Sequence, residues 1–275
     1  MSIPVTNGLV LHLDASAIIG LNNNDLVATW EDLSASENDV LSPLGEEPIY
    51  TENAINGSPA IWFENGYRMI VPNHATLHSM THLYCFMVLV ETTITGIRHF
   101  LAGGTWALYG FDANCGLYIS TDEGDGDWAN NPFQVSSIEI NTPYIFMGTW
   151  NANDEEGNIY FNGEGGSPQS RTGTQIGSTV AVKTLSSLNN PIEGYMGEVL
   201  VYNEELSARE INQINQYLGQ KWLGWELNSY ILQRKLNDGT WETISEIPVG
   251  GVGDLQTPLV ITGQLDVDKI IIEGS

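Results

Sequence analysis

The sequence predicts an all-β protein in which two antiparallel sheets pack face to face. About a dozen short runs are apolar or alternate between apolar and polar residues, and Asn-Gly, Gly-Gly and Asn-Pro pairs separate them. One segment shows helical spacing instead. The chain has 275 residues, 42% of them hydrophobic, with 8 Trp, 11 Tyr and 7 Phe, so it can bury a sizeable core. Many short strands around one core are typical of a β-sandwich.

The expected strands are rich in tyrosine, phenylalanine, tryptophan, valine and isoleucine, which favour extended backbone. The segment TWNANDEEGNIYFNGE predicts a hairpin whose loop is Asn151–Gly157. In chain order, the predicted strands lie near Leu9–Leu13, Ala60–Phe63, Arg68–Val71, Leu83–Glu91, His99–Leu101, Trp106–Phe111, Gly116–Ser120, Phe133–Ile140, Tyr144–Asn151, Asn158–Phe161, Thr179–Val182 and Tyr195–Tyr202.

The segment LSAREINQINQYLGQKW predicts a single amphipathic helix over Ala208–Leu223. Ser207 can cap its first turn, and Glu210, three residues on, can complete a capping box. Its apolar side chains recur at spacings of three and four, as expected for one face packed on the sandwich. These are Ile211, Ile214, Leu218 and Trp222.

After Gly224 the helical spacing ends and short runs of alternating apolar and polar residues follow. Two alternating runs, Tyr230–Lys235 and Trp241–Ile244, flank the turn signal Asn237-Asp238-Gly239 and predict a hairpin. Further strands are expected at Leu259–Thr262 and Lys269–Ile272. We therefore predict a sandwich domain over residues 1–226 and a small β-rich extension over 227–275. The extension has little core of its own, which suggests an attachment or oligomerisation module.

The charge of the chain excludes several partners. There are 34 Asp+Glu against 9 Lys+Arg, a formal net charge of −25, so phosphates of nucleic acids and anionic lipids would be repelled. No apolar run is long enough for a membrane span, so no membrane insertion is expected. The two cysteines, Cys85 and Cys115, cannot form a disulfide scaffold, and Cys85 in the apolar run LYCFMVLV is expected to be a buried free thiol.

Four stretches share their order and spacing with one known family: GLVLHLDAS, WEDLS at Trp30–Ser34, PIYTENAINGSPAIWF at Pro48–Phe63, and GYMGEVLVYNEELSAREINQINQYLGQKW at Gly194–Trp222. With them, residues 7–225 resemble the laminin-G-like branch of the concanavalin A-like lectin/glucanase superfamily. The resemblance implies a curved two-sheet jelly roll.

The motif residues of the resemblance have a structural interpretation. They are expected to fix strand ends, to fill the core between the sheets and to anchor the helix, and Asp32 is expected to cap the turn into Ser34. Buried aromatic side chains among them would each contribute roughly 1.5–3 kcal/mol. The set is Asp14, Trp30, Asp32, Phe63, Glu198 and Tyr202.

Enzymes share the fold that the resemblance implies, so a glycosidase is one alternative. Retaining hydrolysis needs two carboxyl groups about 5–5.5 Å apart. Glucanases of this superfamily carry them on one strand as Glu-x-Asp-x-x-Glu, and that motif is absent from the sequence. We therefore expect a protein without enzymatic activity.

An acidic loop, TDEGDGDWANNP, is a candidate calcium site. Asp122, Asp125 and Asp127 could supply carboxylate oxygens, of which Ca²⁺ takes six to eight from all its ligands. The alternative is a solvated acidic loop. A second alternative for metal is the triplet His74, His78 and His82, spaced by four, which could bind zinc if it were helical. Loop histidines before a strand explain the same spacing.

The same acidic loop is a candidate sugar-binding surface. Sugars are recognised by an aromatic face and by polar side chains that bond their hydroxyls. Trp128 with Asn130 and Asn131 supplies both. Trp106 and Tyr109 could add an aromatic platform, although their alternation with Ala107 and Leu108 equally suits a sandwich strand.

These expectations combine into a functional hypothesis. The fold that the resemblance implies serves mostly outside cells, whereas the N-terminus MSIPVTNGLVLHLDAS lacks the pattern of a secretory signal. A virion surface protein of a tailed bacteriophage satisfies both: a capsid decoration, head fibre or tail adhesin, made in the host cytoplasm. Its expected partners are a capsid or tail protein, further copies of itself, and host or environmental glycans. The alternatives are a secreted bacterial carbohydrate-binding or adhesion module and a divergent glycoside hydrolase.

Overall fold

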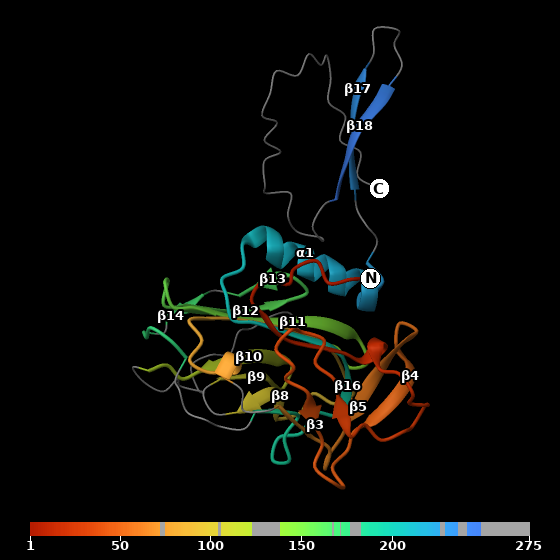
Figure 1. Cartoon of the computed structure of the whole chain (residues 1–275), viewed down its shortest axis with the longest axis vertical. Coiled ribbons are helices and arrows are strands. Elements are labelled where there is room, and N and C mark those ends of the chain that lie inside the picture. Colours follow the sequence, from red (N-terminus) through yellow and green to blue (C-terminus); the bar gives the residue numbers. More distant parts are fainter. Residues whose placement is uncertain are drawn as a thin grey trace.

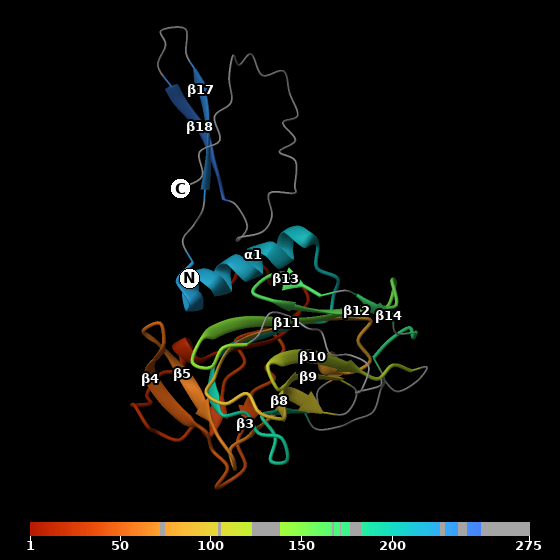
Figure 2. The same cartoon turned by 180° about the vertical axis from the view of Figure 1, so that it is seen from behind.

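The computed structural model confirms a β-sandwich with one helix (Figure 1). It describes residues 1–71, 75–103, 106–122, 138–166, 168–170, 172–176 and 183–225, and the backbone of 229–235 and 241–248. Within these residues the strands form two large antiparallel sheets and one separate hairpin. Figure 2 shows from behind that α1, residues Ala208–Leu218, lies on the outer side of β11 and β12.

The nine-stranded sheet has the order β13-β12-β11-β7-β16-β5-β4, with β1 paired to β16 and β14 paired to β12. Its strands are β1 (Leu9–Asp14), β4 (Ile49–Ile55), β5 (Ser58–Phe63), β7 (His82–Glu91), β11 (Pro143–Asn151), β12 (Glu156–Phe161), β13 (Glu164–Gly165), β14 (Gln169–Ser170) and β16 (Gly194–Tyr202).

The seven-stranded sheet has the order β10-β9-β8-β15-β6-β3-β2. Its strands are β2 (Thr29–Trp30), β3 (Val40–Leu41), β6 (Met69–Val71), β8 (Ile97–Gly103), β9 (Trp106–Phe111), β10 (Asn114–Ile119) and β15 (Lys183–Leu185). Two short 3₁₀ helices, η1 (Ala15–Ala17) and η2 (Ala75–Leu77), follow β1 and β6.

Most predicted strands are confirmed, and β9 has the predicted bounds. The hairpin of β11 and β12 is confirmed as well, with Asn151 paired to Glu156. The predicted strand Phe133–Ile140 is wrong for residues 138–140, which belong to no strand; its other residues, and all of Thr179–Val182, lie outside the described part of the chain. The predicted strands do not include β2, β3, β4, β13, β14 or β15.

The core lies between the two sheets and is rich in aromatic side chains. Phe100 of β8 meets Phe146 of β11 with ring centroids 5.1 Å apart. Trp30 and Phe63 are buried, as predicted. Cys85 is a buried free thiol, also as predicted, and burial raises its pKa to about 12.

One buried ion pair links the two sheets. Glu91 is the last residue of β7, and Arg98 lies in β8 of the opposite sheet; both side chains are 2% exposed. Arg98 Nε donates to Glu91 Oε1 at 2.5 Å, and Nη2 donates to Oε2 at 3.3 Å. The guanidinium also donates to the carbonyl oxygens of Gly96 and Asp112. Every charged atom of this pair is therefore engaged.

The helix begins and ends close to the predicted positions. Ser207 accepts a hydrogen bond from the backbone of Glu210, whose carboxylate accepts one from the backbone of Ser207, so the predicted capping box is present. After α1 the chain continues as a π-helical turn, η4, over Gly219–Leu223. Gly219 is required there, because a Cβ atom would lie 1.9 Å from the ring of Trp225.

We expect Ser207→Ala to lower the free energy of unfolding by about 0.5–2 kcal/mol, since the substitution removes the hydroxyl that accepts from Glu210. Ser207→Gly, which keeps a favourable cap backbone, should cost only a few tenths of a kcal/mol. Urea unfolding followed by circular dichroism measures both. Equal losses for the two variants would contradict this role of the hydroxyl.

The C-terminal hairpin is confirmed as β17 (Ser229–Lys235) paired antiparallel with β18 (Trp241–Pro248). The strands predicted at Leu259–Thr262 and Lys269–Ile272 lie outside the described residues, and the division into 1–226 and 227–275 stays a prediction. Among the described residues, no helix has the length and apolar character needed to cross a bilayer.

Candidate ligand-binding site

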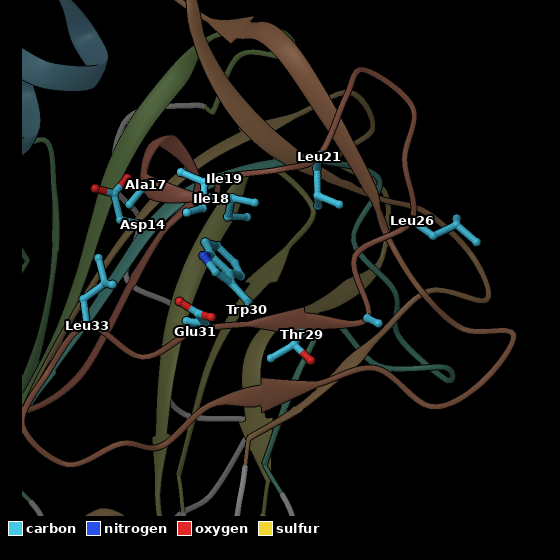
Figure 3. A pocket seen from close by; sticks show the side chains of 11 residues that line it. Asp14, Ala17, Ile18, Ile19, Leu21, Leu26, Thr29, Trp30, Glu31 and Leu33 are labelled. Carbon is cyan, nitrogen blue, oxygen red and sulfur yellow. The ribbon is translucent and has the colours of Figure 1, made fainter.

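A pocket of about 270 Å³ lies beside Trp30, between the segment that follows β1 and the segment around β2 (Figure 3). Its lining is mostly apolar, with two acidic residues and one threonine. The residues are Asp14, Ala17, Ile18, Ile19, Leu21, Leu26, Ala28, Thr29, Trp30, Glu31 and Leu33.

Local hydrogen bonds position the first wall of the pocket. Asp14 ends β1 and caps η1, because its Oδ1 accepts from the backbone and the hydroxyl of Ser16 at 2.9 and 2.6 Å. The chain then leaves the sheet as the apolar run Ile18–Leu21. It returns at Leu26, which forms an isolated bridge to Ile49, the first residue of β4. After this short capped turn, Ile18 and Leu21 pack against the edge of the core, whereas Ile19 faces solvent.

Several of these apolar side chains are open to solvent. Ile19 is 91% exposed, Leu26 57% and Leu33 47%. A single exposed leucine is unremarkable in a folded protein, but neighbouring ones around a pocket often mark a surface that binds something. The three residues together give the pocket an apolar wall.

Two polar groups of the pocket have no partner among the described residues. Trp30 is only 1% exposed, and its indole nitrogen Nε1 has no acceptor there. A buried donor left unpaired costs about 1–3 kcal/mol. Glu31 is exposed, and no hydrogen bond or ion pair joins its carboxylate to the described residues. In Figure 3 both side chains lie within the group of lining residues. The indoles of Trp106 and Trp150 also lack an acceptor, but they do not line this pocket.

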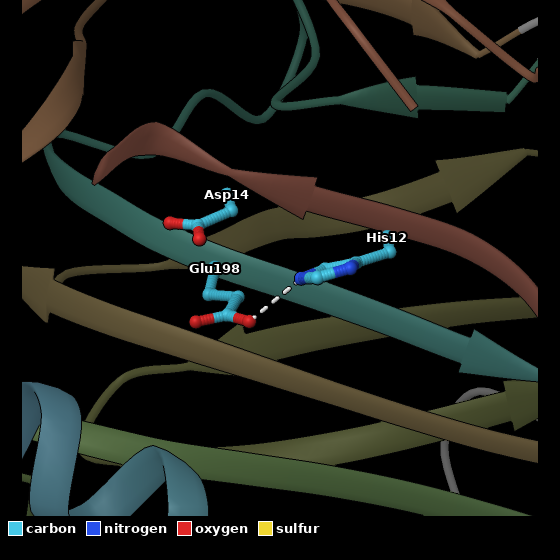
Figure 4. A group of neighbouring side chains, drawn as sticks. All are labelled: His12, Asp14 and Glu198. Atoms are coloured by element: carbon cyan, nitrogen blue, oxygen red, sulfur yellow. Dashed lines mark hydrogen bonds and ion pairs between the residues drawn. The ribbon is translucent and has the colours of Figure 1, made fainter. Parts of the chain in front are cut away.

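Behind the pocket, Asp14 joins a buried polar cluster formed with His12 and Glu198 (Figure 4). Lys221 of η4 bonds Asp14 at 2.6 Å and Glu198 at 2.7 Å. Figure 4 also shows the bond between His12 Nε2 and Glu198 Oε1, which is 2.9 Å long. The ligand atoms of the three residues lie close enough for a metal ion, but the ammonium group of Lys221 already pairs with both carboxylates.

Glu198 anchors the helix through this cluster. Its side chain is 0% exposed, and it accepts from Trp222 Nε1 at 2.6 Å and from the hydroxyl of Tyr217 at 2.9 Å. Burial by itself would raise the pKa of Glu198, but the bond with His12 and the charge and bond of Lys221 outweigh it, so the pKa is lowered. Burial and the neighbouring Glu198 raise the pKa of Tyr217. The anchoring role predicted for Glu198 is confirmed.

The structure describes one residue of the predicted acidic-loop site. Asp122 accepts from Thr174 Oγ1 at 2.7 Å and from the backbone of Thr174 and Gln175 at 2.9 and 3.2 Å. These bonds lower the pKa of Asp122, the one from the Thr174 hydroxyl contributing most. The other predicted ligands lie outside the described residues, so both the calcium site and the sugar-binding surface of this loop stay predictions. They are Asp125, Asp127, Trp128, Asn130 and Asn131.

The predicted aromatic platform is found in the interior. Trp106 is 1% exposed and Tyr109 5%, and the Trp106 ring lies 5.7 Å from the ammonium nitrogen of the buried Lys183. This burial favours the sandwich strand over a platform for sugar, because a covered ring cannot stack on a ligand. Likewise, His78 lies in a bend and His82 begins β7, as loop histidines before a strand would, whereas His74 lies outside the described residues.

The pocket itself was not predicted. The sequence predicts Trp30 only as a core residue, which it is, and predicts no site in the segment after β1. A usable signal was the run AIIGL at residues 17–21, where apolar residues continue past the end of a strand into a turn. Such a run outside a strand or helix indicates either a core contact or an exposed apolar wall. Only the exposure of its side chains in the folded structure distinguishes the two.

No protein-family model and no curated protein matches the sequence. Among solved structures, the chain is similar to the binding domain of botulinum neurotoxin serotype D, with 14% identity and a TM-score of 0.57 over 84% of this chain and 58% of that one. The chain thus spans under two thirds of the length of that domain.

Two further structures of similar proteins contain a sugar. Domain 4 of AbnA, an extracellular GH43 arabinanase from Geobacillus stearothermophilus, was solved in complex with arabinotriose; it is 15% identical, with a TM-score of 0.57 over 77% of this chain and 100% of that one. The serotype D ligand-binding domain was solved with N-acetylneuraminic acid; it is 14% identical, with a TM-score of 0.56 over 84% of this chain and 58% of that one. At these identities the likeness establishes the fold alone, a two-sheet β-sandwich of the jelly-roll type.

Proposed function

We propose that the chain is a carbohydrate-binding module without enzymatic activity, and that its ligand enters the pocket beside Trp30. The observation that carries the proposal is the pocket: a mostly apolar hollow in which one donor, Trp30 Nε1, and one acceptor, the Glu31 carboxylate, are left unpaired by the described residues. A largely apolar pocket with a few convergent polar groups is the usual form of a small-molecule site.

The size of the pocket supports a small ligand. Pockets for drug-sized molecules measure about 300–1,000 Å³, and this one measures about 270 Å³, so it suits one sugar ring or one substituent of a ring. The apolar wall can cover C–H groups of the sugar, while Trp30 and Glu31 bond its polar atoms. The sugar complexes of two proteins of similar fold add support for this class of ligand.

The hydrogen bonds that both carboxylate oxygens of Asp14 accept support binding of a sugar over its hydrolysis. Glycosidases need one carboxyl group as acid and a second as nucleophile or base. The pocket has two, but both oxygens of Asp14 are held, one by Ser16 and the other by Lys221. Glu31 alone is uncommitted. We therefore expect no release of reducing sugar from polysaccharides incubated with the protein.

Glu31→Gln is expected to weaken glycan binding roughly 10- to 150-fold, the equivalent of about 1.5–3 kcal/mol for a hydrogen bond to a charged group. A glycan array finds a binding sugar, and calorimetric titration then compares the variant with the wild type. Glu164→Gln is the matched control, because Glu164 is an exposed acid on β13 outside the pocket. Equal effects of the two substitutions would remove this pocket as the site.

We further propose that the module is displayed on a tailed-phage virion, as a capsid decoration, head fibre or tail adhesin. The buried thiols of Cys85 and Cys115 are compatible with folding in a reducing cytoplasm, and the lectin-like fold is compatible with contact to surface glycans. Immunogold labelling of purified particles with an antibody to residues 1–225 tests the proposal. Absence of label from intact particles would favour a secreted bacterial module instead.

A further inference from the structure

The pocket beside Trp30 is more selective than a general sugar site. Besides the paired Asp14 and the exposed Thr29, its polar groups are one buried N–H donor and one exposed carboxylate, next to each other in the sequence at Trp30 and Glu31. Most of the remaining lining is aliphatic: Ala17, Ile18, Ile19, Leu21, Leu26, Ala28 and Leu33. A ligand that fills this space must offer an apolar group, an acceptor for the indole and a donor for the carboxylate.

We propose that the pocket binds the acetamido group of an uncharged N-acetylated sugar, such as an N-acetylhexosamine. The inference rests on the proposed function and specifies its ligand. The acetamido methyl group packs against the aliphatic wall, its carbonyl oxygen accepts from Trp30 Nε1, and its N–H group or a neighbouring hydroxyl donates to Glu31. Each feature of the group thus has one counterpart in the pocket.

A plain hexose satisfies this pocket less well. Its ring carries hydroxyl groups at most positions, and hydroxyls pressed against the aliphatic wall would lose their bonds to water without finding partners. Burial of an unpaired hydroxyl costs about 1–3 kcal/mol in proteins. The methyl group of an acetamido substituent has no such cost, and its burial is favourable.

The charges around the pocket disfavour an acidic sugar. Among the lining residues none is Lys or Arg, whereas Asp14 and Glu31 are both carboxylates. The charge of Asp14 is paired with Lys221, but that of Glu31 is not. A carboxylate on the ligand would face the Glu31 carboxylate, and the net charge of −25 adds long-range repulsion. N-acetylneuraminic acid is therefore expected to bind less tightly than an uncharged N-acetylhexosamine.

The test is calorimetric titration of the full chain with the methyl glycosides of N-acetylglucosamine, N-acetylgalactosamine, glucose and galactose, and with N-acetylneuraminic acid. We expect one of the two N-acetylhexosamines to bind at least tenfold more tightly than its parent hexose and than the acidic sugar. Saturation-transfer NMR should show the strongest signal on the acetamido methyl protons. Leu33→Asp, which places a charge at the exposed mouth, should abolish binding, whereas Leu188→Asp, similarly exposed but outside the pocket, should not.

The outcomes separate the two proposals. Equal binding of hexoses and N-acetylhexosamines, lost in Leu33→Asp, would overturn the acetamido inference and leave the proposed function standing. Tighter binding of the acidic sugar would do the same. Binding that survives Leu33→Asp would overturn the assignment to this pocket. If no sugar on a broad glycan array binds, both proposals fail.

Discussion

Replacing Glu198 by alanine is expected to lower the free energy of unfolding by about 3–5 kcal/mol, the usual cost of removing one partner of a buried ion pair. The side chain is 0% exposed and accepts bonds from four residues. Without it, one of the two carboxylate partners of the Lys221 ammonium is gone, and the indole of Trp222 and the hydroxyl of Tyr217 lose their acceptors. These four bonds involve His12, Tyr217, Lys221 and Trp222.

Urea unfolding followed by tryptophan fluorescence measures this loss. Glu198→Gln keeps one acceptor oxygen and is expected to cost less than the alanine variant. Glu164→Ala, an exposed acid on β13, should change stability by less than about 0.5 kcal/mol. A loss for Glu198→Ala no larger than that of this control would show that the cluster does not anchor the helix.

Glu198 also makes the free energy of unfolding depend on pH. Its pKa is lowered from the ordinary value of 4.5, although burial acts in the opposite direction. The lowered pKa means that Glu198 contributes its stability above about pH 4.5, and that this contribution is lost as the pH falls through the pKa of the folded state. The stability difference between the wild type and Glu198→Gln should therefore shrink on acidification.

Arg98→Met is expected to destabilise the protein by a similar amount, about 3–5 kcal/mol, because it leaves the Glu91 carboxylate buried without a counter-charge. Both side chains are 2% exposed, so water cannot replace the missing guanidinium without a local opening of the fold. The bonds to the carbonyl oxygens of Gly96 and Asp112 are lost as well. Unfolding is measured in urea, because guanidinium chloride is a salt and would screen the charges of the ion pair.

The double variant Arg98→Met with Glu91→Leu tests the origin of that loss. Replacing a buried ion pair by apolar residues of similar volume is often neutral or stabilising. The double variant should therefore recover most of the stability that Arg98→Met loses. If instead the double variant is no more stable than Arg98→Met, the loss comes from the bonds of Arg98 to the carbonyl oxygens of Gly96 and Asp112, and charge compensation is not the cause.

Much of the fold could be predicted because strands and helices leave periodic signals. The run LYCFMVLV predicts β7, and the spacing of Ser207 and Glu210 predicts the start of α1. Strand β4 was missed because Glu52 and Asn53 interrupt its apolar residues and the register shifts at that point. Strands β2 and β3 have two residues each, too few for any pattern.

The candidate site could not be predicted in the same way. Val27 is fully buried and Ile19 is 91% exposed, yet both are aliphatic residues in the segment between β1 and β2. Only the packing of the whole chain separates them. Trp30 was correctly placed in the core, but whether its N–H group finds an acceptor depends on residues far away in the sequence.

Lys221 and Trp222 stand just before Gly224, where the helical segment ends. Their side chains terminate on Asp14 of β1 and Glu198 of β16, two adjacent strands of the larger sheet. A force applied to the chain beyond Gly224 would therefore act first on the bonds of Lys221 and Trp222. These two bonds would pass the force to β1 and β16, which are paired with each other.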